Sequence, residues 1–322
     1  MLRSGRRSLG CGGAGALAVD TIDPQYADLP IAEEHPALTA VKILQDYLGE
    51  PFSAIVSGEL GGASVAEAFY PAALLGLPVV DADPAGRAVP ELQHSLFTVH
   101  DVPITPQAVT NQFGDAALIT RVANDSRAEA LLRALSLASR NLVWAADHPV
   151  RAQLLKHTII PGAISLAMHV GRAAREAAAG ATAGTTDLAQ AIARSAGGSV
   201  LFRGAIESSS WEDKGGFTLG EFTIAGEGAW AGSGYRIWYK NENLVAWRDG
   251  EPQITCPDLI CVIDDDAKAP LTNPNQRLGM CVSVVGVPAH EMWRSEKGIA
   301  LFGPRSLGWD LDYRPLEVAS QR

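Results

Sequence analysis

The stretch from Ile55 to Glu91 constrains the fold most strongly, because it alternates short apolar runs with glycine turns. An apolar run over 52–57 leads into the turn Gly58–Gly62, helical spacing follows over 64–75, and a second apolar run covers 77–80. A strand, turn, helix and strand in this order predict a βαβ unit, whose two strands are parallel and joined by a right-handed crossover. We therefore expect the first part of the chain to form an α/β domain with a mainly parallel sheet.

The second part of the chain differs in its residue pattern. After Gly198, short β-rich runs alternate with glycine, proline, aspartate and asparagine at the spacing expected of a sandwich or barrel. A chain of 322 residues exceeds the roughly 250 to 300 residues at which single cores stop growing. We therefore predict an α/β domain over 1–197 and a β-rich domain over 198–322, although Gly197 and Gly198 also fit an ordinary helix terminator. Helices are expected at 34–48, 64–75, 161–178 and 187–196, the last with Asp187 as its N-cap, and 126–146 is expected to be a helix or the helical part of a strand–helix pair.

Composition excludes several classes of partner. The formal net charge is -10, and no run rich in lysine or arginine is present. Nucleic acids and anionic membrane surfaces bind clustered cationic side chains, so neither is an expected partner. A hydrophobic content of 47% is typical of a globular protein that buries a core. The expected partner is a small-molecule substrate, and a homo-oligomer, in the simplest case a dimer, is compatible with the sequence.

The cysteines and the N-terminus indicate a cytoplasmic protein. Cys11, Cys256, Cys261 and Cys281 have no C-x-x-C spacing, so free thiols in a reducing compartment are expected. The arginines within 3–7 are followed by glycines rather than by the apolar run of a signal peptide. No run of about 18 apolar residues is present to span a bilayer.

Acidic residues follow both apolar runs of the predicted βαβ unit. Glu59 lies in the first glycine turn, and Asp81 and Asp83 follow the second run. Because neighbouring parallel strands end at the same edge of a sheet, we expect these carboxylates to share one crevice. We assign Glu59 and Asp83 to catalysis, and Asp81 with the turn glycines Gly61 and Gly62 to substrate binding. The alternative is that carboxylates beside glycines merely cap backbone groups.

Arg87 and Glu91 complete the expected catalytic set. The planar guanidinium of Arg87 suits a substrate carboxylate or imide oxygen, and a salt bridge to Glu91, four residues on, is the alternative. Gly12 and Gly13 lie in the glycine turn GCGGAG, which is expected either to contact an anion through backbone N–H groups or to be a plain tight turn.

No cofactor is evident from the sequence. The histidines show no i, i+4 or H-x-H pairing, so a metal site built from histidines is not expected. A divalent cation such as zinc, held by Glu59, Asp81 and Asp83 with one histidine, is an alternative that the sequence leaves open.

Three groups of motifs resemble the S-methyl thiohydantoin desulfurase family, which was long known as a domain of unknown function encoded near hydantoinase and oxoprolinase genes. They are GCGGAG, GELGG with GLPVVDADPAGRAVPELQ, and the C-terminal runs YKNENLVAWRDG, CPDLICVID and LFGPRSLGWDLDY. The segment 16–40 is shorter than in family members. The resemblance covers most of the chain and implies two domains, α/β first and β-rich second.

The resemblance also implies a function. It suggests a hydrolase-like enzyme that desulfurises an S-methyl thiohydantoin or a related cyclic imide, with Asn241 of the second domain in the substrate site. Arg305 is expected to reach the cleft between the two predicted domains, where ligand pockets often form. Asn241 also fits a simple hairpin turn. The alternative function is a non-catalytic small-molecule binding protein, or an accessory subunit of a hydantoinase or oxoprolinase system.

Overall fold

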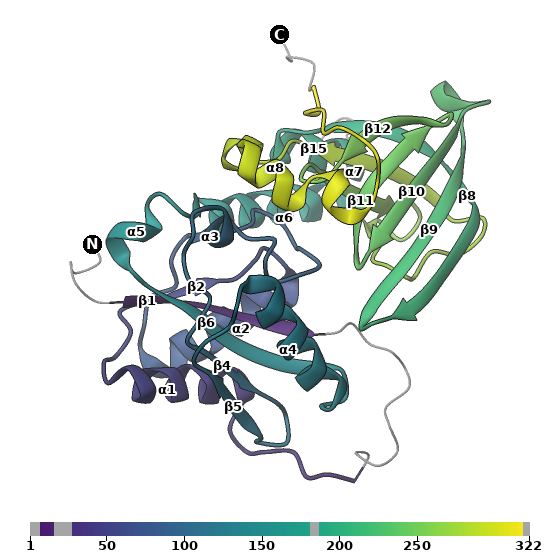
Figure 1. Cartoon of the computed structure of the whole chain (residues 1–322). Coiled ribbons are helices and arrows are strands. Elements are labelled where there is room, and N and C mark those ends of the chain that lie inside the picture. The colour runs from purple at the N-terminus through teal and green to yellow at the C-terminus, as the bar shows by residue number, and fades with distance from the viewer. Residues whose placement is uncertain (1–6, 16–27, 181–186, 318–322) are drawn as a thin grey trace. The chain divides into compact units, whose positions relative to one another are not determined.

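The structure is a computed structural model that describes residues 7–15, 28–180 and 187–317, with the side chains of 7–15 left out (Figure 1). Residues 16–27 of the segment expected to be short, and the Cys11 side chain, therefore lie outside the described part. The chain forms two compact units, Met1–Ile164 and Ser165–Arg322. Gly197, near which the sequence predicted a boundary, is the left-handed C-cap of a helix, with a φ of 70°.

The first unit contains a five-stranded sheet in the order β2-β1-β6-β4-β5. Its elements, in chain order, are β1 (Arg7–Gly15), α1 (Pro36–Leu48), β2 (Ile55–Ser57), α2 (Gly62–Leu75), β3 (Ala82–Asp83), α3 (Leu96–Val99), β4 (Gln107–Thr110), β5 (Ala116–Ile119), α4 (Asp125–Leu137), β6 (Leu142–Arg151), α5 (Ala152–Leu155) and β7 (Ile160–Pro161). α6 (Ala163–Ala178) begins in this unit and continues into the second.

The prediction of a mainly parallel sheet is wrong. Only β1 and β2 pair in parallel among the named strands of this sheet, whereas β1 with β6, β6 with β4 and β4 with β5 are antiparallel. The predicted second strand of the βαβ unit is reduced to a single parallel bridge between Ile55 and Val79. Pro78 has no N–H to extend that ladder, and the chain instead pairs β3 with β7.

Helices cover both faces of the sheet in the first unit (Figure 1). On one face, residues of α1 and α2 pack in a cluster with Ile55, Ala108 and Ala146. On the other face, Leu132 of α4 packs against Val109, Val143 and Ala145. Because successive side chains of a strand point to opposite faces of the sheet, Val56 lies on the second face. It belongs to a cluster that includes Ala82, Phe97, Val150 and Leu155. The loops after β2 and β3 are thus anchored on both sides by buried apolar residues.

The glycine-rich run near the N-terminus is extended rather than turned. Gly12 pairs with Ala145 and Gly13 with Trp144 as β1 runs beside β6. The prediction of a tight turn at Gly12 and Gly13 is therefore wrong, because both residues continue the extended pairing of β1 with β6.

The second unit is a helix-flanked antiparallel sheet of eight strands in the order β12-β11-β10-β9-β8-β15-β13-β14. The expected β-rich character is confirmed. Its elements are α7 (Leu188–Ala196), β8 (Ser199–Lys214), β9 (Phe217–Gly226), η2 (Gly228–Trp230), β10 (Gly234–Lys240), β11 (Glu242–Arg248), β12 (Glu251–Thr255), β13 (Leu259–Asp264), β14 (Ala269–Pro270), β15 (Cys281–Val287), η3 (Glu291–Arg294), α8 (Glu296–Phe302) and η4 (Pro304–Leu307).

The sheet of the second unit encloses an apolar core. The residues buried in this core include Phe202, Phe222, Tyr235 and Tyr239.

Asp187 caps α7 as predicted, because its side chain accepts a hydrogen bond from the Gln190 N–H at 2.8 Å. Within the described residues, Cys256, Cys261 and Cys281 form no disulfide.

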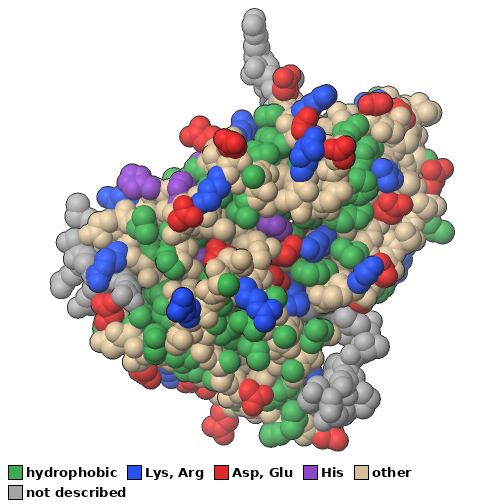
Figure 2. All heavy atoms as spheres, in the orientation of Figure 1, with side chains coloured by type: hydrophobic (Ala, Val, Ile, Leu, Met, Phe, Trp, Pro, Cys, Tyr) green, Lys and Arg blue, Asp and Glu red, His purple; other side chains and the backbone are tan. Residues whose placement is uncertain are grey.

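The surface carries charges of both signs. On the face drawn in Figure 2, lysine and arginine side chains are interspersed with aspartate and glutamate rather than gathered in one area. In the part of the chain that the structure describes, no helix is long and apolar enough to cross a membrane.

Candidate functional site

Glu59 lies in the turn after β2, and both of its carboxylate oxygens accept hydrogen bonds. Oε1 accepts from the Ser64 hydroxyl at 2.7 Å, and Oε2 accepts from the Val89 N–H at 2.7 Å. A Cβ at Gly61 would lie 3.4 Å from the Ser64 Oγ, an ordinary contact, so this arrangement does not itself require glycine there. The side chain of Glu59 is therefore held in one position beside the first turn of α2.

Asp83 ends β3 and is fully buried. Its two oxygens accept from the Gly86 N–H at 2.9 and 2.8 Å, and Oδ2 also accepts from the Ala85 N–H at 3.2 Å. Gly86 has a φ of +73°, and a Cβ there would come within 2.8 Å of the Ile160 Cδ1. Only glycine fits this position without strain, and the turn it permits aims two backbone N–H groups at the carboxylate.

A hydrogen bond joins the two loops. Val89, in the loop after β3, donates its N–H to Glu59. The Leu60 amide, in the loop after β2, lowers the pKa of Asp83. The Glu59 carboxylate is thus bound by the loop that carries Asp83. The predicted meeting of Glu59 and Asp83 takes place. Ile55 and Val79 form a parallel bridge four residues before each of them, and the Val89 hydrogen bond joins their loops.

The environment makes both carboxyl groups weaker acids. Burial raises the pKa of Glu59, against the lowering effects of the Ser64 and Val89 hydrogen bonds and of the Arg87 charge. Burial also raises the pKa of Asp83 to about 7, with a further rise from the Glu59 charge and opposing effects from backbone hydrogen bonds. Two interacting carboxyl groups with raised pKa values can hold a proton near neutral pH and exchange it.

Arg87 is buried beside this pair. Its Nε donates to the Ala88 carbonyl at 3.0 Å, and its charge lowers the pKa of Glu59. We refer to Glu59, Asp83 and Arg87 together as the Glu59–Asp83 site. A buried guanidinium beside two weakly acidic carboxyl groups supplies fixed positive charge for an anion or a developing oxyanion.

The other predicted site residues of the first unit have different surroundings. Asp81 is exposed, and its backbone carbonyl accepts from the Gly162 N–H at 2.8 Å. The Glu91 Oε2 accepts from the Gln93 Nε2 at 2.7 Å. Gly62 is exposed at the start of α2. The structure brings Glu59, Asp83 and Arg87 together, while Asp81 faces solvent two residues before the buried Asp83.

The two predicted residues of the second unit are engaged within that unit. Asn241 forms the β10–β11 turn with a φ of 58°, and its Oδ1 accepts from the Thr218 N–H at 2.9 Å. Arg305 is exposed and pairs with Asp310 at 2.8 Å and Asp312 at 3.1 Å. The hairpin turn expected at Asn241 is confirmed.

The carboxylates do not form a metal-binding set. Among the described residues, no three histidine, cysteine, aspartate or glutamate side chains are grouped so that they could hold a metal ion. The oxygens of Glu59 and Asp83 accept from N–H and O–H donors, and Asp81 is exposed. The residues present therefore do not fit the zinc site that the sequence left open.

Sequence reasoning missed the groups that orient the carboxylates. Ser64 and the Val89 amide fix Glu59, and the Leu60 amide acts on Asp83. A serine five residues after Glu59, at the start of the predicted helix, was a visible signal. The Val89 and Leu60 amides carried none, since any residue but proline has a backbone N–H.

Two family models account for nearly the whole described chain. The model described as S-Me-THD-like, N-terminal domain, matches residues 23–121, and the one described as S-Me-THD-like, C-terminal domain, matches residues 123–316. This chain belongs to the S-Me-THD-like family. The resemblance to the S-methyl thiohydantoin desulfurase family found in the sequence is thereby confirmed. Glu59, Asp83 and Arg87 all lie in the segment that matches the N-terminal S-Me-THD-like domain.

The fold is shared with a solved structure. A crystal structure of a protein from Chromobacterium violaceum aligns with a TM-score of 0.75 at 22% identity, covering 98% of this S-Me-THD-like chain and 85% of the other. At this identity the likeness shows the fold alone. No curated protein matches the sequence.

Proposed function

We propose that this S-Me-THD-like protein is a hydrolase that releases methanethiol from an S-methyl thiohydantoin or a closely related cyclic imide. The observation that carries the proposal is the fully buried Asp83 carboxyl, with a pKa of about 7, coupled to Glu59. A group that is half protonated near neutral pH is suited to proton transfer at that pH. The proposed compartment is the cytoplasm.

The reaction is a substitution at the ring carbon between the two nitrogens. The oxygen of water bonds to that carbon, and the carbon–sulfur bond breaks with its electron pair on sulfur. The two protons of water end on the ring nitrogen and on the leaving methanethiol. The protonated member of the Glu59–Asp83 pair donates a proton to the ring nitrogen, and the guanidinium of Arg87 stabilises negative charge that develops on the adduct.

The test is methanethiol release by the purified full chain. A 5-substituted S-methyl thiohydantoin is the substrate, the matching hydantoin is the blank, and the assay is run with and without added zinc. We expect turnover by the wild-type protein and a loss of about 100-fold or more in Asp83→Asn, whose amide cannot exchange a proton. Asp46→Asn, an exposed position on α1, is the matched control.

Two outcomes would contradict the proposal. Wild-type protein that releases no methanethiol rules out the reaction, and if the same substrate stabilises the protein thermally, the accessory binding function is favoured instead. Folded Asp83→Asn protein with wild-type turnover removes Asp83 from the mechanism. Thermal unfolding of each variant shows whether the fold is retained.

A further inference from the structure

The strand β6 is distorted where Asp147 and His148 lie. Ser8 of β1 pairs with Val150 of β6, and Gly10 pairs with Asp147. β1 thus advances by two residues where β6 advances by three. The extra residue makes a β-bulge, a feature that re-aims side chains and is over-represented beside active sites. His148 has a φ of 45°, although it precedes Pro149, a context that favours extended backbone. Such strain persists only where the surroundings hold it in place.

Asp147 orients the imidazole of His148. The Asp147 Oδ1 lies 2.8 Å from the His148 Nδ1, and both residues are buried. The Asp147 Oδ2 accepts from the Gln107 Nε2 at 3.4 Å, so the carboxylate is fixed from a second strand. The His148 ring stacks on Phe97, with ring centroids 4.6 Å apart and an interplanar angle of 26°. A carboxylate at Nδ1 makes that nitrogen the N–H donor and leaves Nε2 of the neutral ring as an acceptor.

The Nε2 of His148 is buried and has no hydrogen-bond partner among the described residues. His148 as a whole is 4% exposed. A buried polar atom without a partner is destabilising, so native proteins retain few, and each calls for an explanation. A carboxylate, an oriented ring and an unsatisfied acceptor together form the arrangement of an activated general base.

Phe97 stacks on His148 and lies in the buried cluster that contains Ala82, the residue before Asp83. Val56 belongs to the same cluster. Gly10 of β1 pairs with Val56 on one side and with Asp147 on the other. The helix that carries Phe97 also begins against the Asp83 loop, because the Leu96 N–H donates to the Pro84 carbonyl at 2.7 Å. His148 therefore lies on the sheet face that carries the Asp83 loop.

We propose that His148, oriented by Asp147, is the general base of the Glu59–Asp83 site and takes the proton from the attacking water at its Nε2. This assignment rests on the proposed function. As the water oxygen bonds to the ring carbon, Nε2 accepts one proton and the Asp147 carboxylate stabilises the imidazolium. The carboxyl pair gives a proton to the ring nitrogen. When the carbon–sulfur bond breaks, the remaining hydroxyl proton passes to the emptied carboxylate and the imidazolium proton goes to sulfur.

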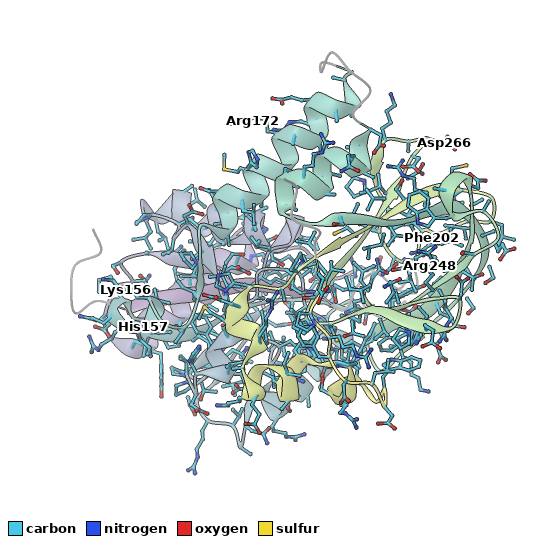
Figure 3. All side chains as sticks on the ribbon, turned by 90° about the horizontal axis from the view of Figure 1, so that it is seen from above. Lys156, His157, Arg172, Phe202, Arg248 and Asp266 are labelled. Carbon is cyan, nitrogen blue, oxygen red and sulfur yellow. The ribbon has the colours of Figure 1, made fainter. Side chains whose placement is uncertain are left out.

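The test compares His148→Gln and Asp147→Asn with the wild-type full chain in methanethiol release from a 5-substituted S-methyl thiohydantoin. We expect His148→Gln to lose about 10²- to 10⁴-fold in turnover. Asp147→Asn should lose about tenfold or more, because the amide no longer selects the tautomer. The matched control is His157→Gln, an exposed histidine beside Lys156 at the periphery of the view in Figure 3, which should retain wild-type turnover.

A structural role is separated from a catalytic one by chemical rescue. Added imidazole should restore turnover to His148→Ala while leaving His157→Gln unchanged. If His148→Gln or His148→Ala does not fold, the decision falls to Asp147→Asn, in which His148 is retained. Folded variants of His148 and Asp147 with wild-type turnover would overturn the inference while the proposed function stands. Wild-type protein without turnover would overturn both.

Discussion

Asp83 is a carboxyl group without exposure to solvent, held by the amides of Ala85 and Gly86. Those hydrogen bonds favour the charged form, yet burial and the nearby Glu59 outweigh them and raise the pKa to about 7. At the scale of single residues, the same interactions that shape the loop also set its acid strength. The shape of the loop and the acid strength of Asp83 cannot be altered separately, so a substitution at Asp83 should affect stability as well as turnover.

The raised pKa of Asp83 predicts how stability depends on pH. Between the unfolded value of 3.8 and about 7, the folded protein binds more protons than the unfolded chain. The stabilisation is therefore complete below the unfolded pKa and is lost as the pH rises through the folded pKa. The loss from this group is about 4 kcal/mol.

Urea unfolding of the wild-type protein and Asp83→Asn from pH 4 to pH 8 measures this dependence. The free energy of unfolding of the wild-type protein, relative to that of Asp83→Asn, should fall as the pH rises from 4 to 8. Asp46→Asn, the exposed control on α1, should follow the wild-type curve. A wild-type-minus-Asp83→Asn difference that is independent of pH would contradict the raised pKa.

At the scale of secondary-structure elements, the conformation of one turn residue fixes how β10 and β11 pair. The β10–β11 turn has one residue, Asn241, in the left-handed region, and its side chain accepts from Thr218 on β9. The neighbouring Asn243 and Asn273 side chains are hydrogen-bonded to each other at 3.1 Å. The Asn241 backbone carbonyl also accepts from the Asn273 Nδ2 at 2.7 Å. Asn241 thus joins the β10–β11 hairpin to β9 and to the loop between β14 and β15 that carries Asn273.

Substitutions at Asn241 should separate its backbone role from its side-chain role. Asn241→Asp keeps the acceptor and should lose least stability. Asn241→Gly keeps the backbone conformation but loses the hydrogen bond, at a cost of about 1 kcal/mol. Asn241→Ala loses both, adding about 1–2 kcal/mol for the left-handed backbone. Chemical denaturation gives the order, and an alanine variant as stable as the aspartate variant would show that the turn does not depend on this side chain.

At the scale of the whole molecule, a buried acceptor holds the last described segment of the second unit. Asp258 has no exposure. Its Oδ1 accepts from the Ala289 N–H at 2.7 Å and the Tyr313 hydroxyl at 2.9 Å, and its Oδ2 accepts from the Leu316 N–H at 2.7 Å. One carboxylate therefore joins segments more than fifty residues apart in the chain.

Removing that carboxylate should release the segment near the C-terminus. Asp258→Ala leaves three donors without their acceptor, so hydrogen exchange at the Leu316 amide should become about tenfold faster or more. Asp266→Ala, at an exposed position labelled in Figure 3, is the matched control. Equal protection of Leu316 in the wild-type protein and Asp258→Ala would show that other contacts hold the segment.

Local patterns in the sequence determined much of this protein. The helix that ends at Leu48, the N-cap at Asp187 and the hairpin at Asn241 follow from apolar spacing, capping chemistry and turn propensity, which act over a few residues. The acidic loops at Glu59 and Asp83 were visible for the same reason, and the motifs around them indicated the family.

Tertiary structure alone decided the strand directions, the burial of Asp83 and the bulge at His148. Apolar spacing shows that a segment is a strand, but it does not show which strand becomes its neighbour or in which direction. The antiparallel return of β6 beside β1, the Val89 amide on Glu59 and the Phe97 ring on His148 join residues that are distant in the chain. Such contacts leave no local pattern, because each depends on the packing of the whole unit.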